Sequence, residues 1–532
     1  MKGLSTIDIV IAVVYILSIL SIGVYFSRKQ KSAKDFLLGG KSMGWFTIGL
    51  SLLATLTSAV GYMSFPAAAL KYGTIMLWMW VAIPVSYPVV TYVFMPFYHK
   101  LNVYTAYEYL ERRFSVSVRL LTSAIFILWR VTWMGAVIYV PSLMLNVVTG
   151  GQLPLVPSII TLGVLSTLNT TLGGVKAVMW ADVIHSLVMF AGMIIALTVI
   201  VYSVPGGLPE IWGTLTESGK TRMTDQIAGW SEANILEKGR LYVLADITVI
   251  SLVVSYSLQK MGNYCVDQAL VQRYLTARSL KISQQGFLLN CFSYTFYIVA
   301  ITLIGVGLFV VAKYHTFPET LASDQVFPFF IANMIPAGLT GLLVAAIYAA
   351  SMSSMDSGTN SCVSAVMNDF YARLYLKVYN LDEGGQSETI DRQKLKISRI
   401  SSVVLGIGIG ITIVACYIGR LGDIFTITAK LINMFAGPLF GIFILGMFTR
   451  RANAVSVLIA GLVGAFVGMV TVFAKPLGLD VFMVGKLWPL ILSFLATYML
   501  GYVLSFVIGK NKADNLDWTW KKIMARKPAS VH

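Results

Sequence analysis

Long apolar stretches recur along almost the whole of this chain, and they limit its fold more than any other feature. A helix needs about 20 apolar residues to cross the hydrocarbon core of a bilayer. Thirteen stretches of this kind can be read along the chain, at 5–26, 44–70, 74–98, 118–148, 155–172, 177–203, 241–264, 283–313, 338–370, 397–418, 424–448, 454–475 and 487–509. The sequence therefore predicts an all-α integral membrane protein with about thirteen transmembrane helices.

The composition agrees with a lipid environment and excludes an ordinary soluble domain. Of the 532 residues, 57% are hydrophobic and only 12% are charged, whereas soluble domains carry about 25% charged residues. The formal net charge of +16 is explained by cytoplasmic loops, which collect Lys and Arg in membrane proteins. We therefore predict the lipid bilayer as a partner, no nucleic acid, and no obligate protein partner.

The residues that carry enzyme chemistry are scattered. The four cysteines lie within or beside apolar stretches and form no CxxC pair, and the four histidines are far apart in the sequence. An enzyme site needs convergent acids, bases or metal ligands. We predict that the protein is not an enzyme and that it has no cofactor.

Basic residues in the connecting loops predict the orientation. Lys and Arg gather in every second loop and in the tail, at 28–41, 100–119, 176, 273–281, 373–396, 450–451 and 510–527. Loops rich in Lys and Arg stay in the cytoplasm. We predict a multi-pass protein of the plasma membrane, of the bacterial inner membrane in particular, with its N-terminus outside and its C-terminus in the cytoplasm.

Two apolar stretches are interrupted by small and polar residues. The first, at 44–70, contains Gly61 and Pro66 after a run of Ser, Thr and Ala. Such residues allow a helix to unwind, and unwound backbone survives at membrane depth only where it lines a cavity. Its free carbonyls would suit a dehydrated Na⁺. The alternative is close helix packing through small residues.

The second interrupted stretch, the ninth, carries hydroxyls and a carboxylate. Ala350, Ser353, Ser354 and Ser357 follow helical i, i+3, i+4, i+7 spacing and share one face. Asp356 is an ionisable group inside the same stretch, where a charge is expensive without a partner or a function. Together these oxygens suit a hard cation. The serines can alternatively bond to carbonyls of their own helix.

Other polar residues lie at membrane depth. Arg130, in the middle of its stretch, is expected to meet an anion, either a protein carboxylate or a substrate. Lys430 also lies inside an apolar stretch and is likewise expected to need an anion. Lys260 and Asn263 make the seventh stretch polar. Asp182 begins a stretch, so a role at a helix N-terminus is the alternative to an ion site.

Four motifs in a fixed order resemble one transporter family. They are Gly-Gly-X-Lys-Ala-Val-X-Trp-X-Asp at 173–182, Asp-Gln-Ala-Leu-Val-Gln-Arg-Tyr-Leu at 267–275, Ser353-Ser354 followed by Asn360-Ser361, and Gly-Pro-Leu-Phe at 437–440. In these motifs the chain resembles the solute:sodium symporter family, which includes the sodium–glucose, proline, monocarboxylate, multivitamin and sialic acid cotransporters. The resemblance extends over 5–509.

The resemblance implies a LeuT-type fold of five-plus-five inverted repeats, with one extra helix before them and two after. It divides the chain into six parts: a leading helix with a cytoplasmic loop (1–43), a first repeat (44–204), an outside loop (205–240), a second repeat (241–448), two trailing helices (449–509) and a cytoplasmic tail (510–532). The broken first helices of the two repeats would be 44–70 and 241–264, and paired broken helices mark the binding site of such transporters.

The resemblance also implies ion sites. The first Na⁺ site maps to the carbonyls and hydroxyls of Ala54, Thr57, Ala350, Ser353 and Ser354. A second Na⁺ site, found in some members, maps to Asp182, Ser353, Asp356 and Ser357. Asp356 stands where a Ser or Thr is expected, and Asp267 stands where the family commonly has Asn. The solute site maps to Thr55, Ser58, Arg130, Lys260, Asn263 and Lys430.

The expected function is sodium-coupled symport of a small organic solute, with Na⁺ as the coupling ion. Arg130 and Lys430 favour a carboxylate-bearing solute, with sialic acid as the leading candidate. A sodium-coupled sugar symporter remains an alternative, and so does a proton-coupled carrier of the same fold that uses Asp182 or Asp356. A channel would need a continuous polar pore. A sensor would need a signalling domain, for which the loop at 372–396 is too small.

Overall fold

The computed structural model describes most of the chain. The described residues are 4–27, 41–101, 103, 105–227, 229–318, 321–376, 396–397, 400, 424–508 and 513–526. The apolar stretch predicted at 397–418 therefore lies almost entirely outside them. Within these ranges the structure contains helices and loops but no strand, and a single isolated bridge joins Met43 to Ala277. The prediction of an all-α protein is confirmed.

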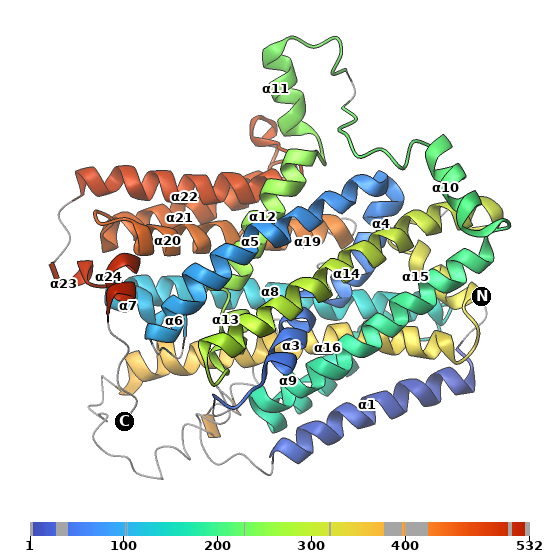
Figure 1. The fold of residues 1–532 in the computed structure, drawn as a ribbon, viewed down its shortest axis with the longest axis horizontal. Coiled ribbons are helices and arrows are strands. Elements are labelled where there is room, and N and C mark those ends of the chain that lie inside the picture. The colour runs from blue at the N-terminus through green and yellow to red at the C-terminus, as the bar shows by residue number, and fades with distance from the viewer. Residues whose placement is uncertain are drawn as a thin grey trace.

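The helices form one elongated bundle (Figure 1). From the N-terminus they are α1 (Thr6–Ser27), α3 (Trp45–Leu56), α4 (Ala59–Tyr72), the 3-10 helix η2 (Gly73–Val81), α5 (Ala82–Pro88), the π-helix η3 (Val89–Phe94), α6 (Met95–Leu101), α7 (Glu108–Arg113), α8 (Val116–Val148), α9 (Leu155–Ser203), α10 (Gly207–Glu217) and α11 (Ile235–Leu244). After these follow α12 (Val249–Val266), α13 (Gln268–Leu275), α14 (Leu280–Tyr314), α15 (Val326–Met334), α16 (Leu339–Ala365), the π-helix η4 (Val366–Leu376), α19 (Ile424–Asn433), α20 (Ala436–Phe448), α21 (Ala454–Val472), the 3-10 helix η6 (Asp480–Phe482), α22 (Trp488–Val507), α23 (Ala513–Leu516) and α24 (Trp520–Ala525).

Many helices in the described ranges have the length and composition of membrane spans. Eight segments qualify, or nine if α11 and α12, bent by 49° to each other, count as one. Three shorter apolar helices join them: α3, the Leu155–Thr167 part of α9, and α20. The predicted number of thirteen is not fixed by these residues, because one predicted span lies outside them.

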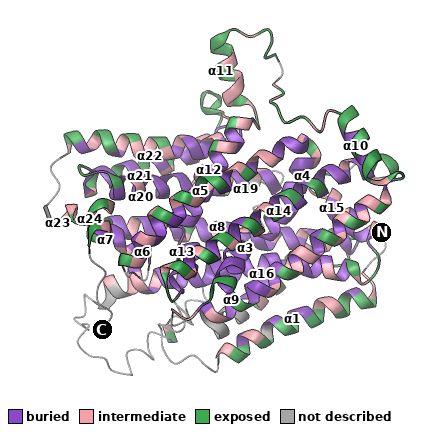
Figure 2. Cartoon of the chain, in the orientation of Figure 1, coloured by how far each residue is buried: buried purple, intermediate pink, exposed green. Residues whose placement is uncertain are grey.

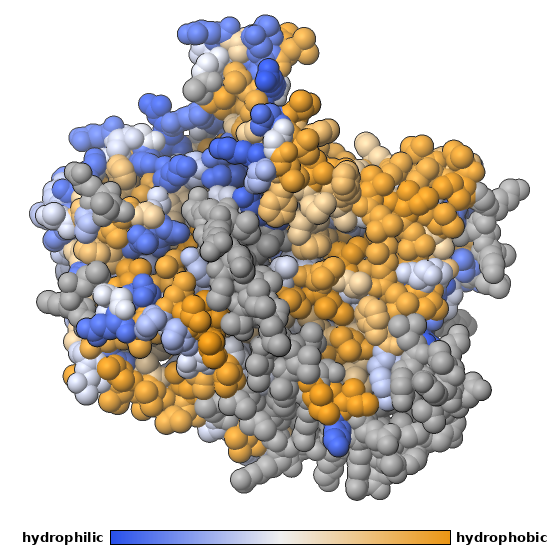
Figure 3. All heavy atoms as spheres, turned by 180° about the vertical axis from the view of Figure 1, so that it is seen from behind, coloured by the Kyte–Doolittle hydropathy of each residue, from blue (hydrophilic) through white to orange (hydrophobic). Residues whose placement is uncertain are grey.

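Apolar side chains cover much of the outer surface, as Figure 3 shows for the face behind that of Figure 1. On α1, for example, Ile7 is 60% exposed and Leu17 is 59% exposed. Such continuous apolar exposure is unfavourable in water and is stable against lipid. The burial pattern in Figure 2 agrees, since α1 is largely exposed while α16 is largely buried.

Helix α16 lies at the centre of the bundle. It packs against α8, α9, α1, α3 and α4, and every residue of α16 from Ala349 to Ala365 is buried. The serines and the carboxylate of this segment therefore lie inside the protein, away from lipid. This central position brings the polar face of α16 against the interrupted helix formed by α3 and α4.

The leading helix α1 is tied to the N-terminal end of α16. The Asp8 carboxylate accepts hydrogen bonds from the backbone N–H groups of Gly338 (2.8 Å) and Gly341 (2.6 Å). These N–H groups are the unsatisfied donors at the start of a helix, and a carboxylate there also interacts favourably with the helix dipole. A Cβ atom at Gly341 would lie 2.5 Å from the Asp8 Cα, so this close approach requires glycine. Further along α1, the Tyr15 hydroxyl contacts the His185 ring on α9.

We expect Asp8→Ala to destabilise the protein by about 1 kcal/mol, because the start of α16 loses its capping acceptor. Thermal unfolding of the purified protein in detergent measures the change. Asp8→Asn is the matched control, since an amide oxygen still accepts these hydrogen bonds, and it should lose much less stability. Equal unfolding temperatures for Asp8→Ala and the wild type would contradict a capping role.

Candidate functional site

The first interrupted helix breaks between α3 and α4. Thr57 leaves the helical conformation (φ −95°, ψ 86°), and Ser58 begins α4 by accepting a hydrogen bond from the Gly61 N–H at 3.4 Å. The backbone N–H and the hydroxyl of Thr57 both donate to the Leu53 carbonyl, each at 2.8 Å. Within the described residues, no hydrogen bond is recorded to the carbonyls of Ala54 or Thr57. The break therefore leaves the carbonyls of both predicted ligands without a recorded partner among the described residues.

A second break lies between α12 and α13, at Asp267. This residue begins α13, where its carboxylate accepts a hydrogen bond from the Ala269 N–H at 2.9 Å. The sequence placed the second broken helix at 241–264, so the break lies three residues beyond that range. Three tyrosine hydroxyls donate to the carbonyls at the end of α12: Tyr274 to Tyr264 at 3.3 Å, Tyr98 to Cys265 at 2.8 Å and Tyr107 to Val266 at 3.1 Å.

The two breaks therefore differ in what they offer a cation. At Asp267 the freed carbonyls accept hydrogen bonds from tyrosine hydroxyls, whereas at Thr57 the carbonyls of Ala54 and Thr57 have no recorded partner among the described residues. A buried carbonyl without a partner is unfavourable by about 1–3 kcal/mol. A bound cation removes that penalty. Of the two, the break at Thr57 is the one that suits a cation.

The polar face of α16 lies against the first break. Ser357 Oγ is 3.2 Å from Thr55 Oγ1 on α3, so this face of α16 points toward α3. On the same face, the Ser353 hydroxyl donates to Asp182 at 2.6 Å, while the hydroxyl of Ser354 is buried without a hydrogen-bond partner in the described ranges. The residues predicted for the first Na⁺ site thus come from two helices in contact.

The residues predicted for a second Na⁺ site surround an arginine. Asp182 accepts hydrogen bonds from Ser353 and, at 2.5 Å, from Ser51. Arg273 Nη2 lies 3.7 Å from the Asp182 carboxylate and donates to Ser357 Oγ at 2.5 Å. The sequence counted Arg273 among the basic residues of a cytoplasmic loop at 273–281, and this was wrong for Arg273, whose side chain is fully buried at the end of α13. Only the fold shows that it reaches α9 and α16.

Asp356 is bonded to a different helix from its own. Its carboxylate accepts a hydrogen bond from Ser166 on α9 at 2.8 Å, and the residue is fully buried. It belongs to the same polar region, yet the structure records no direct bond between Asp356 and the other three predicted ligands of the second site.

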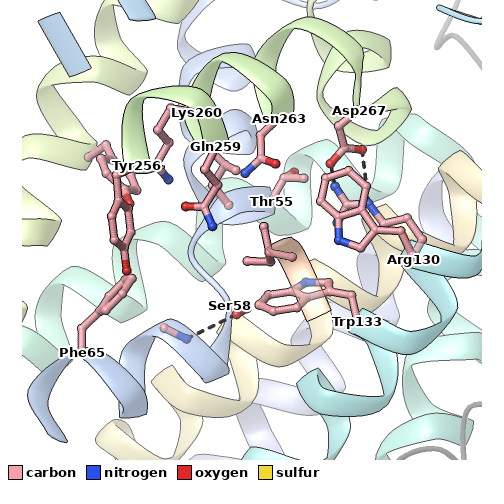
Figure 4. Close-up of a pocket in the computed structure, with 15 residues that line it drawn as sticks. Thr55, Ser58, Phe65, Arg130, Trp133, Tyr256, Gln259, Lys260, Asn263 and Asp267 are labelled. Atoms are coloured by element: carbon pink, nitrogen blue, oxygen red, sulfur yellow. Dashed lines mark hydrogen bonds and ion pairs between the residues drawn. The ribbon is translucent and has the colours of Figure 1, made fainter. Parts of the chain in front are cut away.

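A small cavity opens beside the first break (Figure 4). Its volume is about 60 Å³, enough for a few water molecules. Side chains from both interrupted helices, α8, α14 and α19 line it: Thr55, Leu56, Ser58, Gly61, Phe65, Trp129, Arg130, Trp133, Tyr256, Gln259, Lys260, Asn263, Asp267, Tyr294 and Ile432. Polar groups thus meet several aromatic rings, as is usual in sites for small organic molecules.

Five of the six residues predicted to bind the solute line this cavity. They are Thr55, Ser58, Arg130, Lys260 and Asn263. The sixth, Lys430, is not among the lining residues; its ammonium lies 6.0 Å from the centre of the Phe473 ring.

The cavity contains an ion pair and a second cation. Arg130 Nε donates to one Asp267 oxygen at 3.2 Å, and its Nη2 contacts the other oxygen. The Lys260 ammonium lies 3.8 Å from the centre of the Tyr294 ring, and in the described part of the chain it has no carboxylate within ion-pair distance. The sequence predicted that Arg130 would meet an anion, and the structure identifies Asp267 as that anion.

Comparison with known proteins gives the family. The model of the sodium:solute symporter family matches residues 36–464. The chain belongs to this family. It is therefore a membrane transporter and not an enzyme, as the sequence predicted.

The symporter is similar over most of its length to characterised relatives. It is 31% identical over 469 residues to the sodium/sialic acid symporter SiaT of Proteus mirabilis, covering 88% of each chain. It is 29% identical over 526 residues to the sodium/sialic acid symporter NanT of Aliivibrio fischeri, covering 97% of this chain and 96% of that one. A sodium-dependent multivitamin transporter of Oryctolagus cuniculus is 32% identical over 478 residues, which are 87% of this chain and 70% of the relative.

Solved structures support the same fold. A substrate-bound, outward-open structure of a Na⁺-coupled sialic acid symporter superposes with a TM-score of 0.81 at 28% identity, covering 96% of this symporter and 99% of that chain. A nucleobase-cation-symport-1 family transporter superposes with a TM-score of 0.52 at 11% identity, covering 91% of this chain and 98% of the other. The second similarity concerns the fold alone.

We expect Tyr98→Phe to lower the stability of the symporter by about 1–3 kcal/mol, because the Cys265 carbonyl at the second break loses its buried donor. Thermal unfolding in detergent measures this change. Tyr202→Phe is the matched control, since Tyr202 is 87% exposed. If both variants unfold at the wild-type temperature, the tyrosine hydroxyl does not stabilise the break.

Proposed function

We propose that this symporter uses the Na⁺ gradient to take up a carboxylate-bearing solute, with sialic acid as the leading candidate. The observation that carries the proposal is the break at Thr57, where the carbonyls of Ala54 and Thr57 have no recorded partner among the described residues, on helices that pack against α16 and beside a cavity lined by two cations and one anion. The sodium/sialic acid symporters among its relatives support both the ion and the solute. A neutral sugar remains the second candidate.

The proposed first Na⁺ site joins α3, α4 and α16. Its ligands are the carbonyls of Ala54, Thr57 and Ala350 and the hydroxyls of Ser353 and Ser354. Hard cations prefer such neutral oxygen ligands. The free carbonyls at the break and the buried, unpartnered hydroxyl of Ser354 support this assignment, because each gains a partner when the ion binds.

We further propose a second Na⁺ site, whose ligands are Asp182, Ser353, Asp356 and Ser357. Binding there depends on the position of Arg273. In this structure the Arg273 guanidinium donates to Ser357 and lies near Asp182. A cation placed between these groups would be repelled by the guanidinium. Binding of a second ion therefore requires Arg273 to move away from Ser357.

The proposed architecture is a LeuT-type pair of inverted repeats, at 44–204 and 241–448. The break in α3–α4 and the break in α12–α13 support it, because each falls in the first helix of its repeat. Helix α1 precedes the first repeat, and α21 and α22 follow the second. Loop charges support an N-terminus outside and a cytoplasmic C-terminus, and the bacterial relatives support the bacterial inner membrane.

In the proposed mechanism, Na⁺ fixes the break of the first repeat against α16 of the second. This contact orders Thr55 and Ser58, which line the solute cavity. The rings of Phe65 and Trp133 also line this cavity and offer apolar surface to the solute. One charge crossing 100 mV supplies roughly 2.3 kcal/mol for accumulation.

We expect proteoliposomes that contain the symporter to accumulate labelled sialic acid when an inward Na⁺ gradient is imposed. Na⁺-free vesicles with an inward proton gradient should show only leakage. Protein-free liposomes are the control. Accumulation driven by the proton gradient without Na⁺ would instead favour the proton-coupled carrier. Na⁺-driven uptake of a neutral sugar in place of the acid would favour the sugar symporter.

We expect Ser354→Ala to weaken Na⁺ binding by roughly tenfold or more, because a ligand to a charged group contributes about 1.5–3 kcal/mol. The Na⁺ concentration that gives half-maximal thermal stabilisation measures the effect. Ser361→Ala is the matched control on the same helix, since its hydroxyl donates only to carbonyls of α16, those of Ser357 and Gly358. Unchanged Na⁺ dependence in Ser354→Ala would exclude this residue as a ligand.

A further inference from the structure

The charges that line the cavity do not balance. Among the described lining residues, Arg130 and Lys260 are cations and Asp267 is the anion. All three are nearly inaccessible, with exposed fractions of 5%, 4% and 0%. A buried charge without a counter-ion is unfavourable at membrane depth. One positive charge is therefore left for a solute to neutralise, and the question is which residue carries it.

Arg130 is already neutralised by a tethered anion. Two of its nitrogens contact the two oxygens of Asp267, a two-point pairing that fits guanidinium and carboxylate geometry. Asp267 also accepts a hydrogen bond from the Ala269 N–H and so begins α13. Separating Arg130 from Asp267 would leave a buried carboxylate at the helix break without its cation. An incoming carboxylate would have to compete with a counter-ion that cannot diffuse away.

Lys260 has no such counter-ion in the part of the chain that the structure describes. Its recorded contact is the face of the Tyr294 ring, 3.8 Å from the ammonium, and a cation–π contact leaves the positive charge in place. The side chains of Gln259 and Asn263 project toward the same cavity from α12 (Figure 4). The Asn263 side-chain oxygen is buried and has no hydrogen-bond partner in the described ranges. Helix α12 therefore presents an unpaired cation next to an unpaired acceptor.

We propose that Lys260, and not Arg130, binds the carboxylate of the solute, while the Arg130–Asp267 pair positions α8 against the break between α12 and α13. The inference rests on the proposed function and narrows its solute to a monoanion, because one carboxylate balances the cavity. Asn263, whose oxygen accepts a hydrogen bond, would receive a hydroxyl or amide N–H of the same solute. A dianion would leave an uncompensated charge.

The decisive measurement compares two probes in saturating Na⁺, sialic acid and its methyl ester, which lacks the negative charge. The wild-type symporter should prefer the acid. Lys260→Gln should weaken binding of the acid by roughly 100-fold or more, as expected when one partner of a buried charge pair is removed. Its affinity for the ester should change little, so the preference for the acid disappears. Lys260→Arg keeps the charge and should keep part of the preference.

A double variant, Arg130→Gln with Asp267→Asn, separates the two cations. It removes both members of the ion pair together and leaves no unpaired charge. We expect it to bind the acid less than about tenfold more weakly and to keep the preference over the ester, because a neutral pair can still form a hydrogen bond. Loss of the preference in the double variant, with retention in Lys260→Gln, would overturn the proposal and assign the carboxylate to Arg130.

Stabilisation by Na⁺ alone reports whether each variant is folded, because the proposed Na⁺ ligands lie on α3, α4 and α16. If Lys260→Gln has lost this stabilisation, Lys260→Arg decides: equal affinity for acid and ester in that folded variant contradicts the proposal. A wild-type symporter that binds acid and ester equally would show that the carboxylate-bearing solute itself is wrong. A wild type that prefers the acid, together with a Lys260→Gln variant that also prefers it, would overturn only the role of Lys260.

Discussion

A backbone carbonyl at membrane depth needs a partner from the protein or from a ligand, because lipid offers none. The structure meets this constraint in two ways. At the break after α12, tyrosine hydroxyls, among them those of Tyr98 and Tyr107, donate to the freed carbonyls. At the break after α3, the carbonyls of Ala54 and Thr57 stay open. One interruption therefore has protein donors for its freed carbonyls, and the other is where we propose that a cation binds.

The break after α3 packs against helix α16, which is held firmly in the bundle. Helix α16 is buried along its polar segment, and its Ser353 is bonded to Asp182 of α9. Helix α1 caps the start of α16 through Asp8. The serines that face the open carbonyls are thus held on a helix that is fixed at its start and along its side. An ion that joins α16 to the break links helices of the two proposed repeats, which is how ion binding can influence the solute cavity.

Buried charges follow the same logic of pairing. Arg130 meets Asp267, and Arg273 meets Asp182. In both pairs the acid and the base come from segments more than ninety residues apart in the sequence. Lys260 is the cavity-lining cation in the described chain without such a partner. A transporter site that is neutral except for one charge can select a solute of opposite charge and still remain stable when empty.

The sequence by itself determined the all-helical membrane fold, the family, and the interruption within 44–70, because hydropathy, Gly, Pro and hydroxyl spacing are local properties. It was wrong about the ninth stretch, which forms the continuous helix α16, and it placed the second broken helix short of Asp267. It also identified Arg130 and Lys430 as cations at membrane depth that should meet an anion, and it mapped Lys260 to the solute site. Only the tertiary structure decided which buried cation is already paired with a carboxylate of the protein. That Asp267 reaches Arg130, that Arg273 reaches Asp182, and that Lys430 stays away from the cavity depend on how distant helices pack. Which acid pairs with which base depends on how the helices are arranged in three dimensions. The spacing of residues along one helix carries no information about that arrangement.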